Sequence, residues 1–359
     1  MRVVWLLKKY PDLRRQINAG EIYFGTLDTW LIWKLTGGEV HATDYSCASS
    51  TAFYDPYVLE WSSFVCGVLG IPKNMLPEVL DTNANFGTCK EDILGAPIPI
   101  RACVADQQAA MFGQCCFDTG DIKLTLGTGA FLDLNVGLKA HASVAGFYPL
   151  IGWRMKDEIV HIAEGNSNTC GDAIDWLVHS GYIDTPQVAD EACKSVDSND
   201  LYFVPAFYGI QAPLNDYSAC SALIGISQET RNEHIVRAVL ESLAFRNVQL
   251  FEAMTDETNI SLKSCVCDGG VSNSSVVLQL TSDIIGRTIE TRENSEMSAL
   301  GAAFFAGLAV GLWKDKEELK TLIKTKQVFV PATKSNSETL KRYKKWNEAV
   351  SRSLNWHQK

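Results

Sequence analysis

Residues 104–131 constrain the fold of this chain more than any other stretch of its sequence. The carboxylate of Asp106 comes shortly before a strand-like segment at 123–126, which ends in the turn Gly127-Thr128-Gly129. Because glycine has no Cβ, such a turn lets backbone N–H groups and the threonine hydroxyl approach a phosphate. A nearby carboxylate can accept the proton of an attacking hydroxyl group. Together, these features indicate phosphoryl transfer.

Length and composition are those of an ordinary globular protein. A chain of 359 residues exceeds the usual size of one domain, so two domains are expected. Hydrophobic residues make up 46% of the chain and charged residues 21%, as in proteins with a buried core. The net charge of −10 argues against a general nucleic-acid binder, which usually presents a basic face. It still allows an anionic substrate, since a small site can be locally positive.

The cysteines and the apolar segments bear on the compartment. Eleven cysteines are too few for a disulfide framework in a chain of this length, and no Cys-x-x-Cys pair or zinc-site spacing occurs. We therefore expect free, buried thiols, a cytoplasmic protein and no metal-ligating residue. Residues 1–12 are not a signal peptide, because lysines directly follow a short apolar part. The longest apolar run, 297–313, is shorter than the roughly 20 residues of a membrane span and is expected to form a core helix.

The spacing of hydrophobic residues predicts an α/β fold. Residues 25–36 form a predicted helix with Trp30 and Leu31 among its core residues, and residues 86–103 form two predicted short strands around a turn. Helix 168–179 is expected to be capped by Asn168 or Thr169. The other expected strands are 123–127, 130–137, 147–153, 158–165, 201–207, 264–270 and 287–291, and the other expected long helices are 231–254, 274–285 and 297–312.

Several stretches resemble the FGGY carbohydrate kinases, and among them the glycerol kinases. They include GTLDTWLIWKLT (25–36), VADQQAAMFGQ (104–114), LTLGTGAF (124–131), CDGGVSNSS (267–275) and EMSALGAAFFAGLAVGLW (296–313). The resemblance implies two actin-like, ribonuclease H-like ATPase domains with ATP and substrate in the cleft between them. The implied reaction is transfer of the γ-phosphate of Mg²⁺-ATP to a polyol hydroxyl.

The resemblance assigns roles to three residues on the substrate side. Asp106 corresponds to the catalytic base, Gln107 to an amide that binds polyol hydroxyls, and Phe131 to an aromatic side chain against which glycerol rests. Taken as isolated residues, they also fit a turn aspartate, a polar helix start and a core phenylalanine.

Five further residues are assigned to the nucleotide. Thr128 corresponds to a phosphate contact, Gly171 to a contact at a helix start, and Gly270 to the glycine at the adenosine site. Two nucleotide-side positions depart from the family pattern, with Asp175 in place of Gln and Ser274 in place of Asn. Asp175 adds a negative charge near an anionic ligand, so altered ATP affinity is expected. The implied cofactors are ATP and Mg²⁺, and no protein ligand is assigned to the metal.

The resemblance also divides the chain. It gives residues 1–116 as the substrate-side portion of the first domain, 117–335 as the nucleotide-side second domain, and 336–359 as a peripheral helix. The family's first phosphate loop, an Asp-x-Gly-Thr turn, and its polyol-binding Arg–Glu pair do not occur in these 359 residues. We therefore expect a first domain that is incomplete at its N-terminus, and little or no kinase activity from this chain by itself.

Three functions stay open at this point. The first is phosphorylation of glycerol to sn-glycerol 3-phosphate, the second is a kinase for another sugar such as a pentulose, and the third is a non-catalytic form that binds nucleotide or a partner. The expected partners are ATP and a small polyol, without nucleic acid or a membrane span, and a homo-oligomer is compatible with the sequence.

Overall fold

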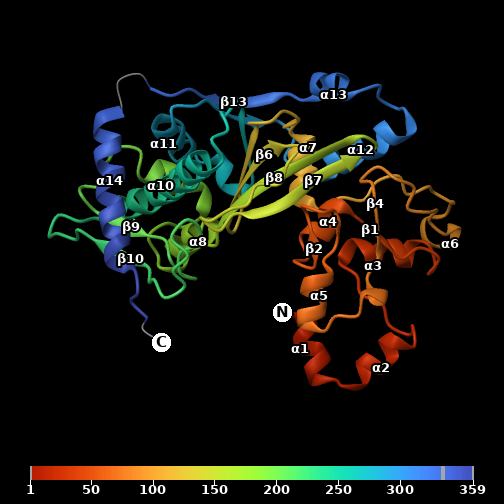
Figure 1. The fold of residues 1–359 in the computed structure, drawn as a ribbon. Helices are drawn as coiled ribbons and strands as arrows, with labels where there is room; N and C mark the ends of the chain where they lie inside the picture. The colour runs from red at the N-terminus through yellow and green to blue at the C-terminus, as the bar shows by residue number, and fades with distance from the viewer. Residues whose placement is uncertain (1, 333–335, 358–359) are drawn as a thin grey trace.

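A seven-stranded mixed sheet forms the centre of the larger part of the molecule in this computed structural model, which describes residues 2–332 and 336–357 (Figure 1). The strand order is β13-β12-β11-β5-β6-β8-β7. β11 runs parallel to β5 and β12, and the other neighbours are antiparallel. The bounds are β5 Ile122–Leu126, β6 Ala130–Gly137, β7 Tyr148–Met155, β8 Glu158–Ser167, β11 Cys265–Asp268, β12 Ile289–Arg292 and β13 Thr325–Phe329.

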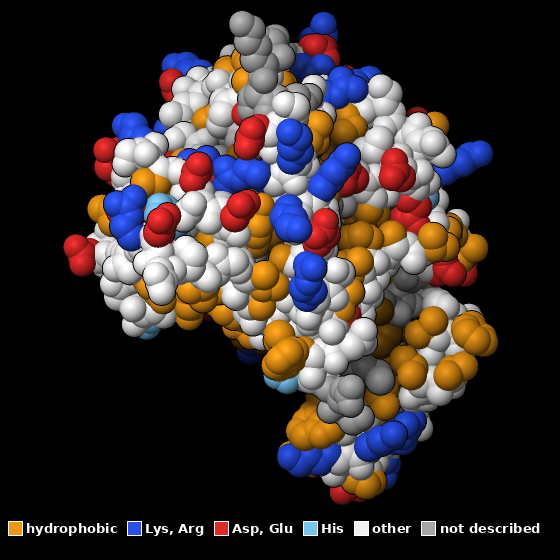
Figure 2. All heavy atoms as spheres, turned by 90° about the vertical axis from the view of Figure 1, so that its left-hand side faces the viewer, with side chains coloured by type: hydrophobic (Ala, Val, Ile, Leu, Met, Phe, Trp, Pro, Cys, Tyr) orange, Lys and Arg blue, Asp and Glu red, His pale blue; other side chains and the backbone are white. Residues whose placement is uncertain are grey.

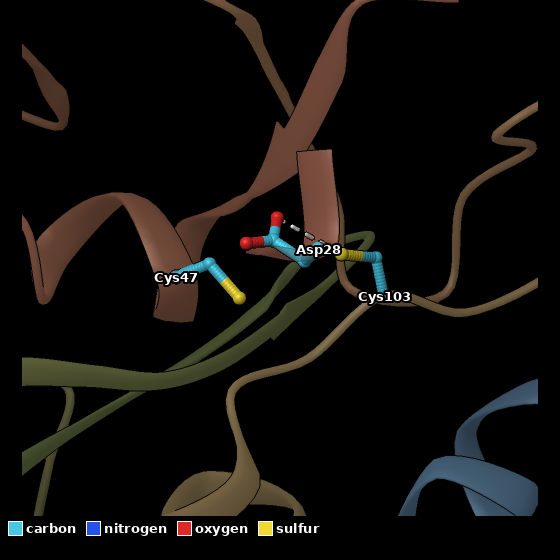
Figure 3. Close-up of side chains that lie close together, drawn as sticks. All are labelled: Asp28, Cys47 and Cys103. Carbon is cyan, nitrogen blue, oxygen red and sulfur yellow. Dashed lines mark hydrogen bonds between the residues drawn. The ribbon is translucent and has the colours of Figure 1, made fainter. Parts of the chain in front are cut away.

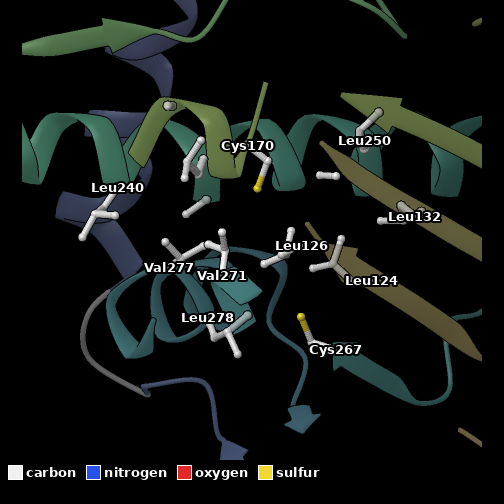
Figure 4. Packing of buried hydrophobic residues seen from close by; sticks show 14 of the residues in the cluster. Leu124, Leu126, Leu132, Cys170, Leu240, Leu250, Cys267, Val271, Val277 and Leu278 are labelled. Atoms are coloured by element: carbon white, nitrogen blue, oxygen red, sulfur yellow. The ribbon is translucent and has the colours of Figure 1, made fainter. Parts of the chain in front are cut away.

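Helices cover both faces of this sheet, and strand residues on each face contribute buried apolar side chains to the packing. On one face, leucines of β5 and β6 pack against α8 (Gly171–His179), α10 (Asn232–Thr258) and α11 (Ser275–Ile285), as Figure 4 shows. On the other face, α7 (Asp106–Gly113), α12 (Met297–Val310) and α13 (Lys316–Leu322) enclose Phe112, Trp153 and Phe305. The expected α/β architecture and the four strands predicted at 123–165 are confirmed.

The C-terminal helix α14 (Asn336–Ser353) packs beside the strand pair β9 (Tyr202–Val204) and β10 (Ala222–Ile224). Tyr343 and Trp346 are buried there, and the indole Nε1–H of Trp346 donates to the carbonyl of Phe203 at 2.7 Å. Charged side chains of both signs cover the face that α14 occupies (Figure 2). The expected helix is thus anchored by its aromatic side, and the expected domain end at 335 lies outside the described residues.

The N-terminal part consists of short elements around small apolar clusters, with only one parallel strand pair, β1–β4, among its described residues. Helix α4 of this part packs against strand β7 of the long β7–β8 hairpin. At this contact, the N–H of Ile151 in β7 donates to Ser49 Oγ in α4 at 3.0 Å. The elements are α1 Arg2–Lys9, α2 Asp12–Asn18, α3 Leu27–Leu35, β1 Ala42–Asp44, α4 Tyr45–Ser49, β2 Tyr54–Asp55, β3 Glu60–Trp61, α5 Ser63–Leu69, η1 Lys73–Met75, β4 Glu78–Leu80 and α6 Glu91–Leu94.

Three local predictions were wrong. In α3, Trp30 and Leu31 are 52% and 44% exposed, and Thr29 and Ile32 are buried instead. Residues 86–103 contain α6 and, in place of two strands, a single antiparallel bridge between Thr88 and Pro99, because only a few backbone hydrogen bonds join residues 86–89 to 98–100. The N-cap residue of α8 is Cys170, not the expected Asn168 or Thr169, and its side chain forms no capping hydrogen bond.

The structure also bears on the predictions about the cysteines and about the apolar run at 297–313. All eleven cysteines are free and nine of them are buried. The apolar run at 297–313 forms α12, whose buried residues include Met297 and Phe304. Among the described helices, none combines the length and hydropathy that a bilayer crossing requires.

Helices α7 and α12 touch backbone to backbone, and this contact sets the position of α7. A Cβ on Gly301 would lie 1.8 Å from the carbonyl oxygen of Ala109, and one on Gly113 would lie 2.3 Å from that of Met297. Glycines are therefore required at this crossing. The N-terminal residue of α7 is Asp106, so the crossing also positions the candidate catalytic carboxylate.

We predict that Gly301→Ala lowers the free energy of unfolding by about 1–3 kcal/mol, because the added methyl group forces the two helices apart. Urea denaturation measures the change. The control is Gly67→Ala in α5, where no atom lies within 4 Å and the helix gains propensity, so its stability should stay equal or rise. Equal losses in both variants would contradict close packing at the crossing.

Candidate functional site

Asp106 stands at the start of α7, where the N-terminal part meets the central sheet. The preceding Ala105 is extended, and its N–H donates to Ser46 Oγ at 2.8 Å. The carbonyl of Asp106 accepts from Ser298 Oγ at 3.0 Å, which ties the residue to α12. Its exposed carboxylate accepts only from the N–H of Gln107, at 2.8 Å, and forms no ion pair among the described residues. The backbone is therefore fixed while the carboxylate stays available to a ligand.

A row of charged side chains crosses the sheet directly under α7. The register pairs Lys123 of β5 with Asp133 of β6, and Asp133 with Glu164 of β8, so the three side chains share one face. Lys123 and Asp133 are completely buried, and Lys123 Nζ lies 2.9 Å from Asp133 Oδ2. This contact is an ion pair whose angle falls outside hydrogen-bond geometry.

One ammonium group faces two carboxyl groups in this row, so one of the two carboxyl groups keeps its proton. Burial raises the pKa of Glu164 to about 8, and the neighbouring Asp133 adds to the effect. Burial also raises the pKa of Asp133, although the Lys123 ammonium opposes the rise. A protonated Glu164 that donates to an ionised Asp133 makes the row neutral, as a buried group requires.

Phe131 belongs to the next row on the same face of the sheet, and Gln107 of α7 contacts that row through Thr125. The register places Thr125 opposite Phe131. The side-chain oxygen of Gln107 accepts from Lys123 Nζ and from Thr125 Oγ1, the latter at 3.3 Å. The structure therefore brings two of the predicted substrate-side residues together over the β5–β6 hairpin, beside the helix that Asp106 begins.

All five predicted nucleotide residues line one cavity of about 630 Å³, hereafter called the nucleotide cavity. They are Thr128, Gly171, Asp175, Gly270 and Ser274. The approach of α8 to the hairpin turn forms one wall, since the N–H of Gly171 donates to the carbonyl of Gly127 at 2.9 Å. A Cβ on Gly171 would lie 2.7 Å from that oxygen, so glycine is needed. A Cβ on Gly270 would meet nothing within 4 Å.

Asp190 also lines this cavity, and sequence reasoning missed it. It lies in α9 (Ala189–Ala192), after the 3₁₀ turn η2 (Pro186–Val188). Its carboxylate accepts from the hydroxyls of Ser274 and Ser275, the latter at 2.9 Å, and from the N–H of Val276 at 3.2 Å. Ser274 also caps α11, because its Oγ accepts from the N–H of Val277. Two hydrogen bonds, one to Asp190 and one from Val277, therefore hold Ser274, the residue that replaces the family's Asn.

A second cluster lies in the N-terminal part and consists of Asp28, Cys47 and Cys103 (Figure 3). Their ligand atoms lie within 4.8 Å of one another, although the residues are too far apart in sequence for a spacing motif to reveal them. Asp28 Oδ2 already accepts from Thr43 Oγ1 at 2.6 Å and from Cys103 Sγ at 3.5 Å. The bond to Cys103 and burial raise the pKa of the Cys47 thiol. We interpret this group as a hydrogen-bonded junction that holds the segment leading to Asp106.

Comparison with known proteins decides the family. The C-terminal domain of the FGGY family of carbohydrate kinases matches residues 122–310, and the N-terminal domain of that family matches residues 1–113. This chain belongs to the FGGY family of carbohydrate kinases. Its fold is the two-domain, actin-like ATPase fold of that family.

Glycerol kinases are among the proteins most similar to this FGGY kinase. Glycerol kinase 5 of Danio rerio is 49% identical over 363 residues, which cover 99% of this chain and 69% of that protein. Glycerol kinase 5 of Homo sapiens is 47% identical over 360 residues, which cover 100% of this chain and 68% of that protein. The crystal structure of Plasmodium falciparum glycerol kinase with ADP superposes with a TM-score of 0.92 at 34% identity, covering 98% of this chain and 71% of that chain.

The buried row leads to a prediction about pH. Between the ordinary pKa of a glutamate near 4.5 and the folded value of about 8, the folded FGGY kinase keeps a proton on Glu164 that the unfolded chain releases. The native state then binds more protons, so stability falls as pH rises through this window, by at most about 1.4 kcal/mol per pH unit.

We predict that Glu164→Gln removes this fall, because a neutral amide can donate to Asp133 at every pH. Urea denaturation at several pH values from 5 to about 8 measures it. Glu293→Gln, at an exposed glutamate, should leave the pH profile of the wild type unchanged. A profile for Glu164→Gln that is parallel to the wild type would show that Glu164 carries no excess proton.

Proposed function

We propose that this FGGY kinase transfers the γ-phosphate of ATP to a polyol, with glycerol to sn-glycerol 3-phosphate as the reaction. One observation carries the proposal: a single hairpin, β5–β6, has Thr128 of the nucleotide cavity at its tip and, on its flank, Phe131 opposite the Thr125 that contacts Gln107. A donor in the cavity and an acceptor beside Gln107 would both lie next to this hairpin. The glycerol kinases among its relatives, and the ADP in the Plasmodium falciparum structure, support the same choice.

In this proposal, Asp106 accepts the proton of the attacking hydroxyl group, and the hydroxyl oxygen forms a bond to the γ-phosphorus as the bond to the β–γ bridging oxygen breaks. ADP and the phosphate ester leave, and the proton returns to solvent. Asp106 suits the role because its carboxylate is exposed and lacks an ion-pair partner among the described residues. Mg²⁺ bound with ATP would neutralise phosphate charge, and the exposed Asp106 oxygens are hard ligands of the kind it prefers.

We propose that the two parts of the chain bind different ligands. Residues 1–116 would supply the substrate side through Asp106 and Gln107, and residues 117–335 the nucleotide side. The substrate would rest its carbon chain on Phe131, which is half-buried and so offers a partly open apolar surface. A short polyol fits a donor amide beside an aromatic ring, and pentuloses are the competing substrates within the same chemistry.

We predict that Asp106→Asn lowers ATP turnover with glycerol at least about 100-fold, because the amide cannot accept the proton. The affinity for ADP should stay within a factor of two or so, since Asp106 does not line the nucleotide cavity. A coupled assay of ADP release and calorimetry measure the two quantities. Asp157→Asn, at the exposed β7–β8 turn, is the control.

Turnover in Asp106→Asn equal to that of the wild type would exclude Asp106 as the base. Wild-type turnover with xylulose or ribulose but not glycerol would replace the substrate. ADP binding by the wild type without turnover of glycerol or either pentulose would favour the non-catalytic alternative instead.

We predict that Asp175→Gln tightens ADP binding by about fivefold, which corresponds to ~1 kcal/mol, the size of one charge–charge repulsion across water. Asp175 is exposed and lines the nucleotide cavity, so its carboxylate would repel the phosphates. Calorimetry at low salt measures the change, and the difference should shrink at high salt. Asp256→Gln, at an exposed aspartate of α10 outside the cavity, should bind ADP as the wild type does.

A further inference from the structure

The buried row under α7 has a consequence for the substrate that Gln107 can accept. Lys123 Nζ contacts three oxygen atoms: the side-chain oxygen of Gln107, Thr125 Oγ1 at 2.7 Å and Asp133 Oδ2 at 2.9 Å. A lysine ammonium group has three N–H donors and no acceptor. Two of the three contacts are hydrogen bonds and the third is an ion pair, and together they fix the position of the ammonium group.

This arrangement determines which way the amide of Gln107 faces. The two ends of a glutamine amide have nearly the same shape, but only the oxygen can accept a hydrogen bond. Because Lys123 can only donate, the oxygen of Gln107 must face the sheet, where Thr125 also contacts it at 3.3 Å. The NH₂ group is left without a hydrogen bond among the residues that the structure describes, and it is free to donate to a ligand.

Charge balance explains why the lysine stays in place. Lys123 and Asp133 are completely buried, and a buried ammonium group without a counter-ion would be very unfavourable. Asp133 supplies the counter-charge, and Glu164 lies beside Asp133 in the sheet register. Asp106 and Asp268 add negative potential from α7 and β11. Of these five groups, only Asp106 has a role in the proposed chemistry.

We propose that Lys123 is a positioning residue: it holds the amide of Gln107 with the oxygen inward and the NH₂ group toward the substrate, so that Gln107 selects substrates with a hydrogen-bond acceptor at that point. A hydroxyl oxygen satisfies this requirement. A protonated amine does not, because it has only donors. This inference rests on the proposed function, since it assumes that Gln107 faces the substrate.

The first test measures the amide itself and needs neither substrate nor turnover. In the full chain labelled with ¹⁵N at glutamine, the side-chain NH₂ group of Gln107 should be rigid in the wild type, by ¹⁵N relaxation. It should become mobile in Lys123→Met/Asp133→Leu, which removes both buried charges and so avoids the unpaired Asp133 that Lys123→Met alone would leave. Lys139→Met, at an exposed lysine, is the control. An equally rigid amide in the double variant would overturn the proposal.

The second test measures selectivity. We expect the wild type to prefer glycerol over 3-amino-1,2-propanediol by at least tenfold in kcat/KM, and Lys123→Met/Asp133→Leu to lose most of this preference, because a free amide can turn its oxygen outward. Adding Gln107→Ala to that double variant should reduce this preference no further. Multiplied losses would show that Lys123 acts independently of Gln107, and would overturn the proposal. Absence of turnover with any polyol would contradict the proposed function alone, because the relaxation test still decides the orientation of the amide.

Discussion

The site depends on how closely two backbone segments approach at the turn of the β5–β6 hairpin. A Cβ on Gly129 would lie 2.8 Å from the carbonyl oxygen of Ser167, and one on Gly171 would lie 2.7 Å from that of Gly127. The turn is therefore clamped between the end of β8 and the start of α8. Because Thr128 sits in this clamp, its orientation toward the nucleotide cavity follows from the backbone and needs no side-chain contact of its own. The same hairpin carries the Lys123–Asp133 pair, so one rigid unit sets both halves of the candidate site.

Much of this hairpin could be predicted from the sequence because its signals are local. Strands at 123–127 and 130–137 around a glycine-rich turn were predicted and are confirmed. The Lys123–Asp133 pair also has a local signal in the sequence. Lys123 is four residues before Gly127 and Asp133 is four residues after Gly129, so a tight hairpin places the two opposite each other. Two opposite charges inside otherwise apolar strands then predict a buried ion pair.

Other features depend on parts of the chain that are distant in sequence, and local patterns cannot supply them. Glu164 joins the row only because β8 pairs with β6, and Asp190 reaches α11 across 84 residues. The buried face of helix α3 could not be predicted from local sequence either. Its apolar residues surround the helix, so periodicity could not show that Thr29 and Ile32, and not Trp30, face the core. The Asp28–Cys47–Cys103 junction likewise joins three distant segments.

The two aspartates that line the nucleotide cavity, Asp175 and Asp190, differ in how far the protein neutralises their charge. This difference affects how well the cavity could hold an anionic ligand. Asp190 accepts from two hydroxyls and from a backbone N–H at the start of α11, where the helix dipole also favours a negative charge. Its charge is therefore largely satisfied within the protein. Asp175 accepts no hydrogen bond through its carboxylate among the described residues, although its backbone carbonyl accepts from His179. Of the two acids, Asp175 alone leaves its charge facing the cavity, so in the proposed function one side chain would carry most of the electrostatic cost of binding phosphates there.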